Sequence, residues 1–256
     1  MSRMKFMNTE IDNLTMQETL QAVDQLIQED KSAYVVTPNV DHIVQLETSK
    51  ELQAVYENAS LILTDGKPLL WIAKWYGTPI KEKISGSDLF PLLCDMAAKK
   101  EYKMFFLGAA EGVAAKAAEN LMNRFKGLQV VGTYSPPFGF EKNQDEMDKI
   151  KSMIKKAAPH ILIVGLGCPK QEKFMYHHCK ELGVPISFGL GASFDFEAGN
   201  IKRAPRWMSN YGLEWLFRIT QDPKRMAKRY LVDDRKIWGL VIKYKKVNLE
   251  WKKLIF

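Results

Sequence analysis

AYVVTPNVD (residues 33–41) and SLILTDG (residues 60–66) are two corners of the same kind. In each of them a short apolar run ends abruptly in small polar residues. A parallel strand that is buried on both faces has this pattern, because its side chains need not alternate between apolar and polar. Pro38 lacks a backbone donor and favours an extended conformation at Thr37, so we expect the first strand to end there. The two corners therefore predict a parallel sheet inside an α/β fold.

Polar side chains at both corners are candidates for a binding site. Thr37, Asn39 and Asp65 follow the two strands directly, and open α/β sheets bind their ligands at the carboxyl ends of the strands. A hydroxyl, an amide and a carboxylate suit a polyol substrate and the acceptance of a proton. The same residue types are also favoured helix caps, so the sequence leaves a structural role open beside the catalytic one.

The strand–helix pattern continues along the chain. After an N-terminal strand or hairpin and a helix within residues 1–32, apolar strand segments alternate with helices up to about residue 200. Such alternation predicts βαβ crossovers and a Rossmann-like, mainly parallel sheet with helices on both faces. We assign residues 1–200 to this core. Further strands are expected at residues 103–108, 128–132, 160–165 and 184–189, and helices at about 49–58, 67–76, 85–100, 109–125, 144–157 and 170–182.

Residues 201–256 differ from the rest of the chain. No strand pattern recurs there, and we expect three helices, at residues 210–220, 223–230 and 233–256. This segment holds 15 Lys and Arg against 5 Asp and Glu, whereas residues 1–200 hold 22 against 25. The positive excess in this segment, which we name the appendage, predicts an anionic partner: phosphate, nucleic acid or a membrane surface.

The last predicted helix has the composition of a helix that lies in a membrane interface. Ile237, Val241, Tyr244 and Trp251 recur at helical spacing, and lysines fill many of the positions between them. Basic helices with such an apolar stripe bind along anionic membranes. The alternative is a helix packed on the protein's own core or on a neighbouring subunit. We favour the membrane.

Localisation signals are few. The first ten residues lack the apolar segment of a signal peptide. No apolar run approaches the roughly 20 residues that cross a bilayer, and three cysteines without CxxC spacing fit a reducing compartment. We therefore expect a cytoplasmic protein that is peripheral on the inner face of the cell membrane.

Two glycine-containing turns follow predicted strands. GAAEG at residues 108–112 lacks the full GxGxxG spacing, so a tight strand–helix turn explains it better than a dinucleotide site. GLGCPKQE at residues 165–172 is more specific, because its glycines allow close approach and Lys170 and Gln171 stand at the start of a helix. This second turn predicts contact between main-chain N–H groups and a nucleotide or diphosphate.

The stretch GLGASFDFEAG, residues 189–199, leads directly to Arg203 and Arg206. Small residues, an acid and paired arginines favour a wall that closes over a charged ligand. Asp195 and Glu197 have a DxD-like spacing, but one acid pair without further ligands is weak support for a metal site, and we expect none. The four histidines show neither metal nor triad spacing.

Three arginines of the appendage could face one ligand. Arg218, Arg225 and Arg229 are seven and four residues apart, a spacing that keeps them on one side of a nearly continuous helix. Arginine binds phosphate in a bidentate manner. A solvated basic face is the alternative, but the aromatic-rich surroundings favour the ligand.

Taken together, these motifs resemble the WecG/TagA/CpsF family of bacterial glycosyltransferases. The resemblance runs from about residue 5 to residue 231, and the ordered series is more specific than any one motif. The matching segments are TPN at 37–39 with Asp41, DG at 65–66, GSD at 86–88, FLG at 106–108, GCPKQE at 167–172, GLGASFD at 189–195, RAPRW at 203–207, GLEW at 212–215, DPKR at 222–225 and RY at 229–230.

The resemblance implies an inverting glycosyltransferase that moves N-acetylmannosamine from a UDP-sugar to undecaprenyl-diphosphate-linked N-acetylglucosamine, in wall teichoic acid or surface polysaccharide synthesis. It implies no metal or other cofactor. It also implies that residues 201–256 meet the membrane and complete the active site of a catalytic core. The sugar could instead be N-acetylmannosaminuronate, glucuronate or glucose, and a homo-oligomer is left open.

Residue roles follow from the same resemblance. Asp65 matches the catalytic base, Thr37 and Asn39 match polar groups of the active site, and Gln171 and Asp195 match the nucleotide side. Lys83 and Lys228 stand where we would expect arginine, and Asp222 where glutamate is usual. The substrate-binding residues that we expect are Gln171, Asp195, Gly108, Gly167, Lys170, Ser87, Arg203, Arg206, Arg218, Arg225 and Arg229.

Two other classes of protein are alternatives. A nicotinamide-dependent reductase would have a glycine-rich first turn with an acid about 20 residues beyond it, whereas the first turn here is TPN at residues 37–39. A protein that binds RNA or DNA would use the basic appendage, but we expect no nucleic-acid partner.

Overall fold

The computed structural model describes residues 3–245 of the 256-residue chain, without the side chains of Arg206 and Asn210. The part of the last predicted helix that contains Trp251 lies outside the described residues. No helix within residues 3–245 is long and apolar enough to cross a membrane.

The chain begins with the expected hairpin and helix. Strands β1 (Arg3–Phe6) and β2 (Thr9–Asp12) pair antiparallel, and helix α1 (Met16–Glu29) follows. The Thr15 side chain accepts from the Glu18 backbone N–H, while the Glu18 carboxylate accepts from the Thr15 N–H. This capping box satisfies two backbone donors that the first helical turn leaves without partners.

Six parallel strands form the central sheet, in the order β4-β3-β8-β7-β5-β6. The chain therefore moves outward from β3 to β4, crosses to the other half, and returns through β7 and β8 to lie beside β3. The predicted α/β class with a parallel sheet is confirmed. The strands are β3 (Ala33–Val36), β4 (Leu61–Ile62), β5 (Lys103–Gly108), β6 (Gln129–Tyr134), β7 (Ile161–Gly165) and β8 (Ile186–Gly189).

Helices cover both faces of the sheet, because alternate strand residues point to opposite sides. Tyr34 and Val36 belong to one buried cluster, and Val35 between them belongs to the other. The first cluster includes residues of α2 (Val40–Leu46), α3 (Lys50–Glu57), α4 (Lys67–Trp75), α7 (Gln144–Ala157) and α8 (Lys170–Leu182). The second includes residues of α1, α5 (Gly86–Lys100), α6 (Val113–Arg124) and α9 (Ser193–Ala198).

Two short helices of the core, α2 and α9, were not predicted. Helix α2 begins immediately after the first corner because Asn39 caps it: its Oδ1 accepts from the backbone N–H of Asp41 at 3.1 Å. The capping role left open for Asn39 is therefore real. Helix α9 is six residues long, too short for its apolar periodicity to be recognised in a glycine-rich stretch.

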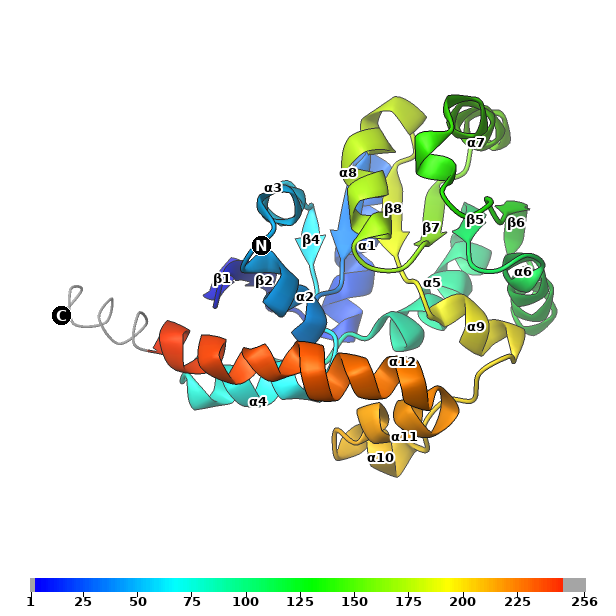
Figure 1. The fold of residues 1–256 in the computed structure, drawn as a ribbon. Helices are drawn as coiled ribbons and strands as arrows, with labels where there is room; N and C mark the ends of the chain where they lie inside the picture. The colour runs from blue at the N-terminus through cyan, green and yellow to red at the C-terminus, as the bar shows by residue number, and fades with distance from the viewer. Residues whose placement is uncertain (1–2, 246–256) are drawn as a thin grey trace.

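The appendage continues as a helical run that lies against the core. Helices α10 (Arg206–Asn210), α11 (Glu214–Gln221) and α12 (Pro223–Ala227) come first. A π-helical turn (Lys228–Asp233), a 3₁₀ turn (Asp234–Lys236) and a helix over residues 237–245 follow without a break. Figure 1 shows this last run, in orange and red, lying beside α4.

One face of the last helix packs on the core. Ile237 and Val241 are 7% and 5% exposed, and the Tyr76 hydroxyl donates to the Val241 carbonyl at 2.8 Å. These two residues belong to the stripe that the sequence assigned to a membrane, so that assignment was wrong for them. The same apolar periodicity suits a helix that packs on a protein core and a helix that lies in a membrane interface.

Candidate active site

A cleft with a cavity volume of about 630 Å³ lies along the carboxyl ends of β3, β7 and β8. Eleven of the expected catalytic and substrate-binding residues line it. Gly108 and Arg203 lie outside the lining, and the Arg206 side chain is outside the described part of the chain. The lining includes Thr37, Asn39, Asp65, Ser87, Gly167, Lys170, Gln171, Asp195, Arg218, Arg225 and Arg229.

Asp65 lies where the second corner meets the first. Its backbone N–H donates to the Pro38 carbonyl at 2.8 Å, which ties the two corners together. Among the side chains that the structure describes, its carboxylate has no hydrogen-bond or ion-pair partner. Burial raises the pKa of Asp65, and the nearby Arg218 and Lys83 oppose that rise. A carboxylate with a raised pKa and no partner is suited to accept a proton from a substrate.

Asn39 connects the core to the appendage. Its Oδ1 lies 2.8 Å from His42 Nδ1 and accepts from the Arg229 guanidinium at 3.2 Å. Arg229 also pairs with Asp41, with 3.3 Å between the nitrogen and Oδ2. Because the Asn39 oxygen is occupied by these donors, its amide NH₂ is the group left to face a ligand.

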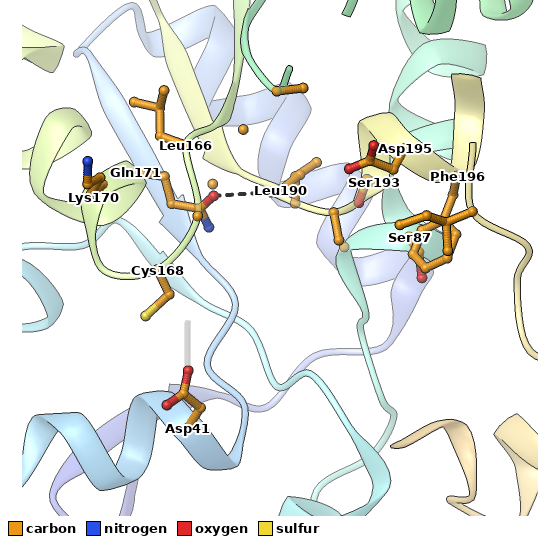
Figure 2. A pocket seen from close by; sticks show the side chains of 18 of the residues that line it. Asp41, Ser87, Leu166, Cys168, Lys170, Gln171, Leu190, Ser193, Asp195 and Phe196 are labelled. Carbon is orange, nitrogen blue, oxygen red and sulfur yellow. Dashed lines mark hydrogen bonds between the residues drawn. The ribbon is translucent and has the colours of Figure 1, made fainter. Parts of the chain in front are cut away.

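Gln171 is turned into the protein. Its Oε1 accepts from the Gly191 N–H at 3.1 Å and its Nε2 donates to Glu172 Oε1 at 2.8 Å. The side chain thereby joins the first turn of α8 to the loop after β8. Figure 2 shows Lys170, Gln171 and Cys168 on one side of the cleft, Ser193, Asp195 and Ser87 on the other, and Asp41 below.

Behind Gln171 lies a buried polar cluster that the sequence did not reveal. His42 Nε2 is 3.3 Å from Glu172 Oε1, and donor atoms of His42, Cys168 and Glu172 lie within 4.8 Å of one another. Burial disfavours the imidazolium, but Cys168 and Glu172 outweigh it and raise the pKa of His42 well above its usual value. A His, Cys and Glu set could bind a metal. Here, however, His42 and Glu172 already contact each other and Glu172 accepts from Gln171.

Arginines of the appendage lie over the cleft. The Arg218 guanidinium carbon is 5.6 Å from the centre of the Phe196 ring. Arg225 is more exposed, and its Nε lies 2.7 Å from Asp222 Oδ2. The appendage therefore places cations opposite the glycine-rich turns of the core. Arg203 instead pairs with Asp88 outside the cleft.

A sequence model of the glycosyl transferase WecG/TagA/CpsF family matches residues 4–250, a range that includes both core and appendage. The chain belongs to this family. It is therefore a glycosyltransferase, and the reductase and nucleic-acid binder alternatives are dropped.

Individual relatives of this glycosyltransferase cover most of its length. A protein of Bacillus spizizenii is 34% identical over 203 residues, which are 79% of this chain and 76% of the relative. A protein of Bacillus subtilis is 31% identical over 174 residues, 68% of this chain and 66% of the relative. One of Staphylococcus aureus is 25% identical over 229 residues, 89% and 88%. All three are named N-acetylglucosaminyldiphosphoundecaprenol N-acetyl-beta-D-mannosaminyltransferase.

Two further parts of the site were missed by sequence reasoning. The loop at residues 136–140 forms part of the cleft wall, and Phe138 in it is fully exposed with Lys170 Nζ 4.8 Å from its ring centre. Lys83, noted only as a departure from arginine, lies between core and appendage. Its Nζ is 3.2 Å from Asp88 and 3.7 Å from Glu214.

Lys83→Met should loosen the appendage. Burial disfavours the charge of Lys83, but Glu214, Asp88 and Asp65 outweigh it and raise its pKa. Removing the amine leaves Asp88 and Glu214 without their shared cation. We expect the free energy of unfolding to fall by about 1–2 kcal/mol, which is less than for a fully buried ion pair because Asp88 is partly exposed.

Thermal unfolding and limited proteolysis after residue 200 would measure this loss, with Lys83→Arg as the conservative control and Lys81→Met as the matched surface control. Lys81 pairs with Glu18 at 2.9 Å on the exposed surface, where ion pairs contribute little. Equal melting temperatures for Lys83→Met and wild type would contradict the role of Lys83 as the cation that links the core to the appendage.

Proposed function

We propose that this glycosyltransferase transfers N-acetylmannosamine from a UDP-sugar to undecaprenyl-diphosphate-linked N-acetylglucosamine, with inversion at the anomeric carbon. The names of its relatives supply the sugar and the acceptor. The product would serve wall teichoic acid or a related surface polysaccharide. The cleft supports the division of labour between donor, acceptor and base.

The donor belongs in the main cleft. Its volume falls within the range of about 300–1,000 Å³ that small-molecule sites occupy. Gly167 and Lys170 stand at the start of the 13-residue helix α8, where free N–H groups and the helix dipole favour a diphosphate. Asp195 lies on the opposite wall, within reach of a ribose or base.

The acceptor belongs in a second, smaller cavity between the start of α4 and the appendage. This cavity has a volume of about 90 Å³, and Asp65 and Arg218 line both it and the main cleft. An inverting transfer needs a base that reaches the acceptor hydroxyl on the face of the sugar opposite the leaving diphosphate. That Asp65 is shared by two cavities is the observation that carries the proposal. The second cavity is further lined by Asn39, Val40, Gly66, Lys67, Pro68, Gly212, Glu214, Trp215, Arg229, Tyr230 and Asp234.

The chemical step needs only the donor, the acceptor and a base. The acceptor hydroxyl oxygen forms a bond to the anomeric carbon as the bond from that carbon to the UDP oxygen breaks. Asp65 takes the hydroxyl proton, and UDP leaves with the bonding electron pair. Arg218, Arg225 and the α8 N–H groups stabilise the charge that develops on the diphosphate.

A donor panel tests this function. Purified protein is incubated with a short-chain lipid-diphosphate N-acetylglucosamine and, in turn, the UDP derivatives of N-acetylmannosamine, N-acetylmannosaminuronate, glucuronate and glucose. We expect acceptor-dependent UDP release with N-acetylmannosamine. Release with only one of the other sugars would reassign the donor, and release with none of them would overturn the proposal.

A further inference from the structure

Large apolar side chains are exposed together on two helices that are far apart in the sequence. Trp71 and Trp75 of α4 are 53% and 50% exposed, and Trp238 of the last helix is 71% exposed. Ile242 follows Trp238 by one helical turn and is also exposed. Soluble proteins rarely leave such side chains contiguous on the surface without a binding role.

Contacts place these side chains on one side of the molecule. Lys245 Nζ lies 3.4 Å from the centre of the Trp75 ring. Trp238, Ile242 and Lys245 are four and three residues apart, so they share the flank of the last helix that faces α4. Lys243 lies on the other flank and pairs with Glu47. Figure 1 shows α4 beside this helix. We name the surface formed by Trp71, Trp75, Trp238 and Ile242 the α4 face.

Positive charge lies beside the α4 face. Lys74 of α4 and Arg235, three residues before Trp238, are exposed, and within the described chain neither of them pairs with an acid. Asp233 is the exposed acid close to Arg235 in sequence. Surfaces in which tryptophan stands beside unpaired lysine and arginine bind at the boundary of an anionic bilayer. Two copies of this face would repel each other, which disfavours self-association.

The α4 face adjoins the second cavity. Lys67 and Pro68 of α4 line that cavity, and so does Gly212. A Cβ on Gly212 would come within 2.5 Å of the Trp71 ring, so the cavity wall touches the α4 face directly. A headgroup held at this surface would need only a short path to Asp65.

We infer that the α4 face binds an anionic phospholipid bilayer, so that the core itself, through Trp71 and Trp75, carries half of the membrane-binding surface. This inference rests on the proposed function, in which the acceptor is lipid-linked. Bilayer docking through α4 would hold the second cavity at the lipid boundary. The appendage alone would then be insufficient for membrane binding.

The test is sedimentation of the full chain with vesicles of phosphatidylglycerol and phosphatidylcholine, and with phosphatidylcholine alone. We expect wild type to bind the anionic vesicles and Trp71→Gln/Trp75→Gln to bind at least roughly tenfold more weakly. Met122→Gln/Val131→Gln is the matched control, because these residues of α6 and β6 are 40% and 37% exposed away from the α4 face. That control should bind like wild type.

Trp75→Gln alone guards against misfolding of the double variant, since Trp75 lines neither cavity. It should weaken vesicle binding and transfer to a long-chain acceptor in vesicles, yet keep wild-type turnover of a short-chain soluble acceptor. Unchanged vesicle binding by both Trp variants would overturn the inference. A second result would also overturn it: light scattering shows that wild type forms dimers and that Trp75→Gln does not, while neither protein binds vesicles. If wild type showed no turnover, only the proposed function would be contradicted, because vesicle binding is measured without substrate.

Discussion

We expect Asp65→Asn to lower kcat by about 10²- to 10⁴-fold, the range that general base catalysis contributes. The asparagine has the same shape, and the carboxylate it replaces has no hydrogen-bond or ion-pair partner among the described side chains, so the fold should be kept. UDP binding should be kept as well, because the base acts on the acceptor side. Steady-state UDP release and calorimetric UDP binding would separate the two effects.

The same carboxylate predicts a pH dependence. Burial raises the pKa of Asp65 in the folded protein, so kcat/KM should rise with pH through that raised value as the base loses its proton. The charged form is the one that burial penalises. The loss of stability caused by burying this charge is therefore absent below the pKa that Asp65 has in the unfolded chain, and complete above its raised pKa in the folded protein.

Asp65→Asn should consequently unfold at a higher temperature than wild type at neutral pH, with the gap closing in acid. Asp145→Asn on the exposed start of α7 is the matched control: it should leave the rate unchanged and lower stability by about 0.3–1 kcal/mol, the opposite sign, because an acid near a helix N-terminus is stabilising. Wild-type turnover by Asp65→Asn would remove Asp65 from the chemistry.

Arg218→Ala should be the second large loss, with kcat reduced by about 10²- to 10³-fold as for other groups that stabilise transition-state charge. Arg218 lines both cavities and lowers the pKa of Asp65 through its charge. Arg225→Ala should cost less, since Arg225 is more exposed and shared with Asp222. Arg218→Lys should recover part of the rate only, because an ammonium cannot bind phosphate in a bidentate manner.

Lys224→Ala provides the comparison for charge loss within the appendage, because Lys224 neighbours Arg225 but lines neither cavity. Single-turnover rates at saturating donor would report the chemical step. If Arg218→Ala and Lys224→Ala turned over equally fast, Arg218 would have no role at the diphosphate.

The central sheet was predictable because each buried parallel strand is encoded by its own local apolar run. Thr37, Asn39 and Asp65 could be named as site residues for the same reason: parallel strands bring their carboxyl ends to one edge. The covering of this edge by Arg218 followed from charge and from the family resemblance. These features need only local sequence and a known topology.

Other parts of the site depend on contacts that no local pattern records. His42 and Glu172 are 130 residues apart, and neither stands in a recognisable metal or catalytic motif. Gln171 lines the cleft and its assignment to the nucleotide side stays a prediction, but the sequence did not show that its polar atoms are hydrogen-bonded to Gly191 and Glu172. In the last helix, Ile237 has the same periodic signal whether core or lipid covers it, so only tertiary packing decided between them.

The π-helical turn at Lys228–Asp233 fixes how the two ends of the appendage are oriented relative to each other. A π-helical turn holds an additional residue compared with an α-helical one, and each α-helical residue rotates the chain by about 100°. Deleting that residue from the stretch after Arg229 would restore an α-helical turn and leave Arg229 near Asp41 and Ile237 against the core, whereas deleting a second residue would rotate Ile237 and Trp238 by about 100° about the helix axis. One deletion between residues 228 and 236 should therefore be tolerated among functional homologues, whereas insertions and longer deletions there should be scarce.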